Sequence, residues 1–259
     1  MRKLLGGIAA LLLAGIAVAT GTAVAGGTEA GTVSFELSGQ AFSFMPAGED
    51  GLCMGVTEVT QAQYEAVMGE NPSHFRGANL PVEQVSWYDA IYFCNALSMA
   101  AGREPVYAVD GERDVATWGY VPHRGNRPAG RITQDLAASG FRLPTEAEWE
   151  YAVKGGQDCR FAGSDLLDEV GWYVVNSGGR THPVAQKKPN AYGLYDMSGN
   201  VWEWVWDPYG KDVRSRYYRG GSWYYGSNYS SPVNRVSNRS NYYAYYQCDF
   251  IGFRLCFRK

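Results

Sequence analysis

Hydrophobic residues are distributed along the chain in short groups, separated by glycine, proline and turn dipeptides. Such punctuation limits strands to a few residues and leaves much of the chain in loops. A fold with little regular secondary structure is therefore expected. The candidate strands are Val33–Leu37, Asn200–Trp206 and Gly252–Phe257.

Three segments carry helix start signals of one kind. Thr60, Ser86 and Thr145 each stand three residues before a side chain that can reach back to the amide of the cap. This reciprocal spacing is the capping box, and a glycine after a helix commonly ends it. The predicted helices span residues 61–68, 87–101 and 146–154, with glycine at positions 69, 102 and 155. A single α+β domain over residues 26–259 accommodates them, and the polar segment Val109–Leu136 is expected to be a long loop or insertion within it.

An alternating pattern occupies residues 200–206, Asn-Val-Trp-Glu-Trp-Val-Trp. Because successive side chains of a strand point to opposite faces, the tryptophans share one face and Glu203 lies between valines on the other. A carboxylate in apolar surroundings needs a cation or several donors. Asp196 and the turn at Gly199 can add a carboxylate and carbonyl oxygens, which suit Ca²⁺. A structural calcium site is expected; the alternative is that Glu203 pairs with an arginine and Asp196 caps a turn.

The N-terminus has the layout of a secretory signal peptide. Two basic residues precede the apolar run Leu4–Val18, and Ala23-Val24-Ala25 offers small residues for cleavage. The run is short for a membrane span. We therefore expect residues 1–25 to be removed and the mature protein to be exported to the periplasm, cell surface or medium, with no transmembrane anchor after signal removal.

Charge and sulfur content exclude several classes of function. A formal net charge of −3 argues against a nucleic-acid partner, which usually leaves a basic footprint. Five cysteines are too few for a disulfide scaffold but allow one or two bridges, and the odd number leaves at least one thiol free or paired between molecules. The three histidines are scattered and no C-x-x-C occurs, so local zinc motifs are absent.

The C-terminal part of the chain has an unusual composition. Between Trp223 and Gln247, tyrosine, serine and asparagine fill 16 of 25 positions. Asparagine and serine bury poorly, and a buried tyrosine hydroxyl needs a partner, so a core does not explain the segment. Antibody paratopes share the composition because tyrosine offers a large amphipathic contact at low entropy cost. The segment is expected to form a binding surface.

Seven blocks of the sequence, in order, resemble the signature blocks of the formylglycine-generating enzyme (sulfatase-modifying factor) family. The resemblance runs from about residue 40 to the end and implies an α+β, C-type lectin-like fold with long packed loops. The blocks are Val56–Gln61, Asn71–Phe75, Leu80–Trp87, Arg142–Tyr151, Gly193–Trp204, Arg219–Trp223 and Ile251–Arg254.

The family's catalytic residues do not carry over. Its oxidases bind copper through two cysteines after Arg-Gly-Gly-Ser, and thiolates suit Cu(I). Here these positions are Tyr225 and Ser230, so no copper and no oxidase activity are expected. A second branch uses a histidine cluster at a non-haem iron, which this chain also lacks.

Two structural features are implied by the resemblance alone. Its calcium site falls on Asp196, Gly199, Val201 and Glu203. Its disulfide would join Cys94 to the residue after Gly-Phe-Arg, but Leu255 stands there and Cys256 comes one position later. A one-residue shift turns a strand side chain to the opposite face, which leaves a Cys94–Cys256 bridge open.

The pattern inside the tyrosine-rich segment resembles the variable proteins of diversity-generating retroelements. Framework positions interrupt runs of residues that randomised adenines of AAY codons can encode, and Cys248 would be one such outcome. The predicted variable ligand-binding residues within about 223–250 are Tyr224, Tyr225, Gly226, Asn228, Tyr229, Ser240, Asn241, Tyr242, Tyr243, Tyr245, Tyr246, Cys248, Asp249 and Phe250. The framework positions are Arg235, Asn238, Arg239, Ala244 and Gln247.

These observations predict an exported, non-catalytic protein that binds a protein or other macromolecule, including one on another cell, through a hypervariable surface. One alternative is a binding module of the same fold with a fixed surface. The other is a relative of the sulfatase-modifying oxidases or non-haem iron enzymes.

Overall fold

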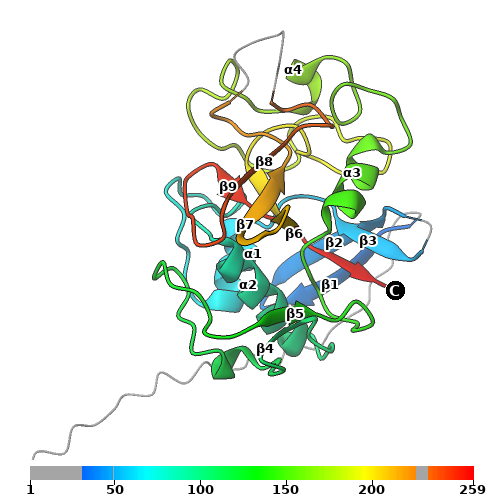
Figure 1. The fold of residues 1–259 in the computed structure, drawn as a ribbon. Helices are drawn as coiled ribbons and strands as arrows, with labels where there is room; N and C mark the ends of the chain where they lie inside the picture. The colour runs from blue at the N-terminus through cyan, green and yellow to red at the C-terminus, as the bar shows by residue number, and fades with distance from the viewer. Residues whose placement is uncertain (1–30, 49, 226–232) are drawn as a thin grey trace, which may run out of the picture.

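The computed structural model describes residues 31–48, 50–225 and 233–259, so the predicted signal peptide lies outside the described residues. Within these ranges, four α-helices and one 3-10 helix are distributed among ten short strands, which confirms the expected α+β class (Figure 1). The helices are α1 Gln61–Met68, α2 Trp87–Ala100, η1 Val115–Thr117, α3 Glu146–Lys154 and α4 Leu167–Val170. The strands are β1 Val33–Leu37, β2 Gln40–Pro46, β3 Leu52–Gly55, β4 Tyr107–Val109, β5 Ile132–Gln134, β6 Trp202–Tyr209, β7 Asp212–Arg219, β8 Arg239–Tyr243, β9 Ile251–Gly252 and β10 Cys256–Arg258.

The three predicted helices are confirmed, and each begins with the expected capping box. Thr60, Ser86 and Thr145 accept from the backbone amides three residues on, and the side chains there accept from the cap amides. Gly69 and Gly155 end α1 and α3 in the left-handed conformation. Helix α2 ends one residue earlier than predicted, with Ala101 as its cap. Capping is a local interaction, which is why the sequence pattern located these helices.

Two four-stranded sheets share the C-terminal segment of the chain. The first has the strand order β1-β2-β3-β10, and the second has the order β8-β7-β6-β9. Residues 252–257, predicted as one strand, are in fact divided between them: β9 pairs parallel with β6, and β10 pairs antiparallel with β3. The turn between them brings Arg254 into the interior, where its guanidinium donates to the carbonyls of Gly55 and Tyr195.

The core is rich in aromatic side chains. Trp87, Trp204 and Phe253 are fully buried in the larger of its clusters, and Trp149 is fully buried in a second cluster with Met197. Tryptophan indoles also bond the backbone across the core: Trp204 Nε1 donates to the Val85 carbonyl at 3.0 Å and Trp87 Nε1 to the Val205 carbonyl at 2.9 Å. These bonds fix helix α2 against the sheet that carries β8.

The polar segment predicted as an insertion is a loop closed at its base by two short strands. β4 and β5 pair antiparallel, Tyr107 opposite Gln134, and the chain between them makes the η1 turn. Cys94 and Cys256 are both buried, and all five cysteines are free thiols. Within the described residues, no helix has the length and apolar character needed to cross a membrane.

Candidate ligand-binding surface

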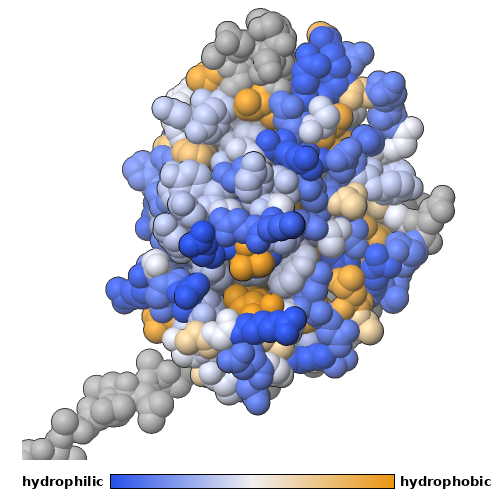
Figure 2. All heavy atoms as spheres, in the orientation of Figure 1, coloured by the Kyte–Doolittle hydropathy of each residue, from blue (hydrophilic) through white to orange (hydrophobic). Residues whose placement is uncertain are grey.

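The second sheet and the loop that follows it present a cluster of exposed tyrosines. Tyr224, Tyr225, Tyr242, Tyr243 and Tyr245 keep between 38% and 54% of their surface accessible. A contiguous patch of exposed aromatic side chains is typical of an interaction site. Figure 2 shows mainly pale, weakly polar residues over β8 and the segment that leads to β9. These five tyrosines of the predicted surface are therefore accessible to a ligand.

The tyrosine rings pack against one another. Tyr243 and Tyr245 are stacked with centroids 5.4 Å apart, and the rings of Tyr242 and Tyr246 are 4.0 Å apart. Such pairs restrict rotamers before any ligand arrives, which lowers the entropy cost of binding. The aromatic pairs thus form a partly ordered contact surface.

Phe250 joins the two predicted variable patches. Its ring lies 5.8 Å from that of Tyr224, in stacked orientation, and 5.4 Å from that of Tyr225. Residues Gly226, Asn228 and Tyr229 of the first patch lie outside the described residues. Within the described part, residues from both ends of the segment converge on one surface.

Strand β8 carries the next predicted variable residues. It is an edge strand that pairs only with β7, with Ser240 opposite Tyr218 and Asn241 opposite Tyr217. Ser240 and Asn241 are half-buried, whereas Tyr242 and Tyr243 at the end of the strand are exposed. The contact area therefore increases toward the loop that follows β8.

That loop is held through its backbone. The Trp87 amide donates to the Ala244 carbonyl at 3.0 Å, and Ala244, a predicted framework position, is fully buried. The carbonyls of three predicted variable residues also accept from the scaffold, and these bonds do not depend on side-chain identity. The pairs are Gln84 N to Cys248 O at 2.9 Å, Trp202 N to Phe250 O at 2.8 Å, and Trp223 Nε1 to Asp249 O at 2.9 Å.

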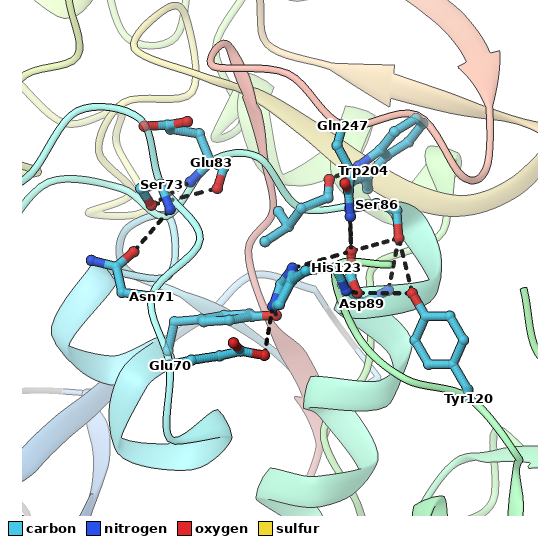
Figure 3. Close-up of polar contacts among 12 residues, drawn as sticks. Glu70, Asn71, Ser73, Glu83, Ser86, Asp89, Tyr120, His123, Trp204 and Gln247 are labelled. Atoms are coloured by element: carbon cyan, nitrogen blue, oxygen red, sulfur yellow. Dashed lines mark hydrogen bonds and ion pairs between the residues drawn. The ribbon is translucent and has the colours of Figure 1, made fainter. Parts of the chain in front are cut away.

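A buried carboxylate connects the loop to the rest of the fold (Figure 3). Asp89, in the first turn of α2, is fully buried and accepts from Gln247 Nε2 at 2.9 Å. It also accepts from the amide and hydroxyl of Ser86, from the Tyr120 hydroxyl at 2.8 Å and from the His123 amide at 2.9 Å. One side chain thus fixes three segments: the cap of α2, the insertion loop and the framework of the variable segment.

Cys248 does not belong to the contact surface. It is 8% exposed, and its side chain lies in the core. Burial raises the pKa of its thiol to about 12, so it stays protonated and unreactive at neutral pH. The prediction that Cys248 contacts ligand is corrected: a residue at this position acts by packing under the surface.

Glu83 is a buried acid beneath the same loop that sequence reasoning missed. It has no exposed surface; one oxygen accepts from the Phe75 amide at 2.8 Å, and the other has no partner in the described structure. Burial raises its pKa to about 7, and the charge of Asp249 adds to the rise. Glu83 lies three residues before the N-cap of α2. An acidic residue there is usually exposed, so the local sequence does not indicate that it is buried.

Glu83 is expected to make stability depend on pH. Its pKa is raised in the folded state, so its contribution is fully present below the unfolded value near 4.5 and is lost as pH rises through about 7. A rise from 4.5 to about 7 corresponds to roughly 3 kcal/mol. Glu83→Gln keeps an acceptor for the Phe75 amide and should abolish a pH-dependent loss of that size. Urea unfolding of both proteins at acidic and alkaline pH tests this. A parallel decline in the two proteins would exclude Glu83 as the cause.

The predicted calcium ligands have a different arrangement. Glu203 is fully buried and binds Arg254 through both oxygens, at 2.7 and 2.8 Å, while Trp149 Nε1 donates to it at 2.6 Å. Its role as a calcium ligand stays a prediction, and in this structure its cation is Arg254. This is the pairing that the sequence left as the alternative.

Asp196 remains the one side chain of that set with a vacant oxygen. Its Oδ2 accepts from the Ala185 amide at 2.7 Å, and its Oδ1 is buried without a partner among the described residues. The described residues contain no group of three or more His, Cys, Asp or Glu side chains suited to a metal ion. With Gly199 and Val201 able to offer only carbonyls, calcium binding stays a prediction.

The copper position of the oxidases holds part of the tyrosine surface instead. Tyr225 is exposed and packs edge-on against Tyr224 and Phe250. The second position, Ser230, lies outside the described residues. A phenol in place of a thiolate removes a soft ligand for Cu(I).

The chain is similar in sequence to a chaperone protein and to formylglycine-generating enzymes. It is 41% identical over 194 residues to the chaperone protein LppX of Paenibacillus barcinonensis, covering 66% of this chain and 68% of that one. It is 30% identical over 183 residues to the mouse formylglycine-generating enzyme, covering 61% of this chain and 49% of the enzyme. The chain thus spans about half the length of that enzyme.

Two solved structures are similar over most of the chain. Treponema denticola variable protein 1 superposes with a TM-score of 0.78 at 36% identity, covering 87% of this chain and 98% of that one. CarF superposes with a TM-score of 0.65 at 32% identity, covering 80% and 86%. These matches confirm the expected C-type lectin-like fold. The family model of the sulfatase-modifying factor enzyme 1-like domain matches residues 16–259, and the chain belongs to this family.

Proposed function

We propose that the protein is an exported, non-catalytic ligand-binding protein whose tyrosine-rich C-terminal surface varies between copies of the gene and binds a protein or other macromolecule. The observation that carries the proposal is that, in residues 239–252, some residues are exposed to a ligand while others hold the loop in place. Tyr242, Tyr243 and Tyr245 are exposed at predicted variable positions, while main-chain carbonyls, the buried Ala244 and the half-buried Gln247 hold the loop.

The similarity to Treponema denticola variable protein 1 supports this function over an enzymatic one. The two thiols that would hold copper are replaced by Tyr225 and Ser230. The second candidate function is enzymatic, and it is favoured by the similarity to formylglycine-generating enzymes. Copper-dependent oxidation of a cysteine-containing peptide by the purified protein would favour that candidate.

Sequencing of the gene across isolates tests the variation itself. Differences confined to codons derivable from AAY, together with a near-copy of the segment and a reverse transcriptase gene nearby, are the expected result. An unchanging C-terminus would instead favour a fixed binding module.

The exposed tyrosines are expected to be dispensable for folding. The free energy of unfolding of the triple variant Tyr242→Ser, Tyr243→Ser, Tyr245→Ser should lie within about 1.5 kcal/mol of that of the unchanged protein, because surface substitutions rarely exceed ±0.5 kcal/mol each. The control is Tyr218→Ser on the neighbouring strand. Tyr218 is 8% exposed and packs against Trp202 and Trp204, so its loss should cost about 3 kcal/mol. Denaturant unfolding compares them, and comparable losses would identify the surface tyrosines as core.

A further inference from the structure

A groove of about 450 Å³ lies between the insertion loop and the variable segment. In Figure 1 the green loop after β4 lies on the side of the molecule that also carries the red segment before β9. Both contribute to the groove, together with α2 and β7. Its lining includes Tyr88, Asn126, Arg127, Arg214, Tyr243 and Tyr245.

The lining carries positive charge and contains no acidic side chain. Arg127 is exposed, and no carboxylate of the described residues forms an ion pair with it. Arg214 is 70% exposed and pairs with Asp212 at 3.1 Å on the solvent side. Exposed pairs of this kind are weak and exchange readily for other partners. Both guanidinium groups can therefore be used by a ligand.

A third arginine adds to the charge from below. Arg216 stands two residues after Arg214 on β7, so the two side chains share a face of the strand. It is buried over the Trp87 ring at 3.9 Å, and its Nε has no acceptor in the described structure. Burial lowers its pKa to about 10, which still leaves it protonated at neutral pH.

The phenol of Tyr88 lies close to this charge. Burial raises the pKa of Tyr88, and the positive charges of Arg216 and Arg127 act against that rise. The positive charges of Arg127, from the insertion loop, and Arg216, from β7, thus both act on the Tyr88 hydroxyl. Guanidinium groups bind carboxylates through paired hydrogen bonds, which Arg127 and Arg214 can offer to an anion in the groove. Arg216 adds only its charge, because it is buried and donates to the Trp206 carbonyl at 2.8 Å.

The groove combines residues of two kinds. Tyr243 and Tyr245 are predicted variable positions, whereas Tyr88, Arg127 and Arg214 lie outside the variable set. Variation would therefore alter one wall of the groove and leave the cationic wall unchanged. Each version of the protein would keep the same charge preference and differ in the shape it presents beside it.

The cationic wall is fixed in place by the framework. Tyr120 and the His123 amide bind Asp89, which also binds Gln247 at the base of the variable segment. The insertion loop and the variable segment are thus tied to one carboxylate a few residues from the groove. A preformed site of this kind costs less to order on binding.

We propose that this groove binds an acidic segment of a protein ligand, with Arg127 and Arg214 as constant anchors and the variable tyrosines as selectors. The inference rests on the proposed function and names the chemistry of its ligand. Tyrosine and arginine together are typical of the energetic centres of protein interfaces, which favours a peptide over other polyanions.

The test uses a fluorescent peptide of eight glutamates, with an eight-glutamine peptide as the neutral probe, and follows anisotropy with the full-length mature protein. The glutamate peptide should bind at about 0.05 M salt and dissociate as salt approaches about 0.5 M. The double variant Arg127→Ala, Arg214→Ala should weaken its binding at least tenfold. The matched control Arg124→Ala, Arg131→Ala removes two exposed arginines of the same loop that do not line the groove, and should retain binding within about twofold.

Several outcomes would overturn the inference. Equal binding of both peptides, or equal loss in both double variants, would mean that the groove does not recognise the charge. Arginine-dependent binding of heparin without binding of the glutamate peptide would assign the groove to a polysaccharide. Unfolding curves of the variants exclude loss of fold as the cause.

The groove and the proposed function can fail separately. If the glutamate peptide binds through the arginine pair while the gene proves constant across isolates, the groove stands and the variable function is wrong. If the gene varies as expected but the peptide does not bind, the function stands and the acidic ligand is wrong.

Discussion

Replacing Arg254 with methionine is expected to destabilise the protein by about 3–5 kcal/mol, the cost of leaving one member of a buried ion pair alone. Arg254 and Glu203 are both fully buried, and the guanidinium also holds the carbonyls of Gly55 and Tyr195. Two more buried acids are close by, since Glu58 and Asp196 act electrostatically on Arg254. Without Arg254, the carboxyl groups of Glu58, Asp196 and Glu203 would remain buried near one another and would have lost the cation that acts on all three.

The same substitution on the surface provides the control. Arg160 pairs with Asp165 at 3.5 Å with more than half of each side chain exposed, so Arg160→Met should cost no more than about 1 kcal/mol. Urea unfolding of both variants measures the difference. Similar losses at the two positions would show that the buried pair contributes no more than an exposed one.

Replacing Asp89 with alanine is expected to destabilise the protein by about 4 kcal/mol, because several buried donors lose their acceptor at once. The Ser86 amide, the His123 amide and the Gln247 amide group would lose this acceptor, and the Ser86 and Tyr120 hydroxyls would keep only their 3.3 Å contact with each other in its place. Since Asp89 holds both walls of the cationic groove, binding of the glutamate peptide should fall together with stability.

Asp114 allows a matched comparison for Asp89. It caps η1 by accepting from the Ala116 amide at 2.9 Å and lies in the exposed part of the insertion loop. Asp114→Ala should cost about 1 kcal/mol, the usual loss of a helix cap. Thermal and urea unfolding, combined with hydrogen exchange in residues 110–131, distinguish the two. Unchanged exchange in Asp89→Ala would mean that the loop is held by other contacts.

The parts of the fold that could be predicted are those set by local interactions. Thr60, Ser86 and Thr145 locate their helices because the capping partner is only three residues away. The strand at residues 33–37 was also predicted with its observed limits. Gly31 before this strand and Ser38-Gly39 after it mark its limits in the local sequence.

The interior ionic contacts could not be predicted in the same way. Glu203 and Arg254 are 51 positions apart, and nothing in either segment specifies the other. The strand predicted over residues 252–257 was wrong for the same reason, because the burial of Arg254 divides it between two sheets. Both the ion pair and the division of the strand depend on contacts between residues far apart in the sequence, which a local sequence pattern does not indicate.

The candidate surface falls between these cases. Composition alone indicated that Tyr242, Tyr243 and Tyr245 would be exposed. It gave no sign that Cys248 would be buried, or that Arg127 and Arg214 would lie beside the tyrosines. Exposure follows from residue type, whereas the neighbours of a surface residue follow from the path of the whole chain.

The hydrogen bonds that the scaffold makes to the carbonyls of Cys248, Asp249 and Phe250 affect how freely this protein can evolve. A carbonyl is present whichever amino acid is encoded, so new codons at these positions inherit the same loop path. If the segment varies as proposed, a population of genes could therefore explore many ligands while few of its members fail to fold. Residues 240–246 are likewise held through their backbone, by the pairing of β8 with β7 and by the Ala244 carbonyl, so they are a suitable place for a synthetic library in which Ala244 is kept constant.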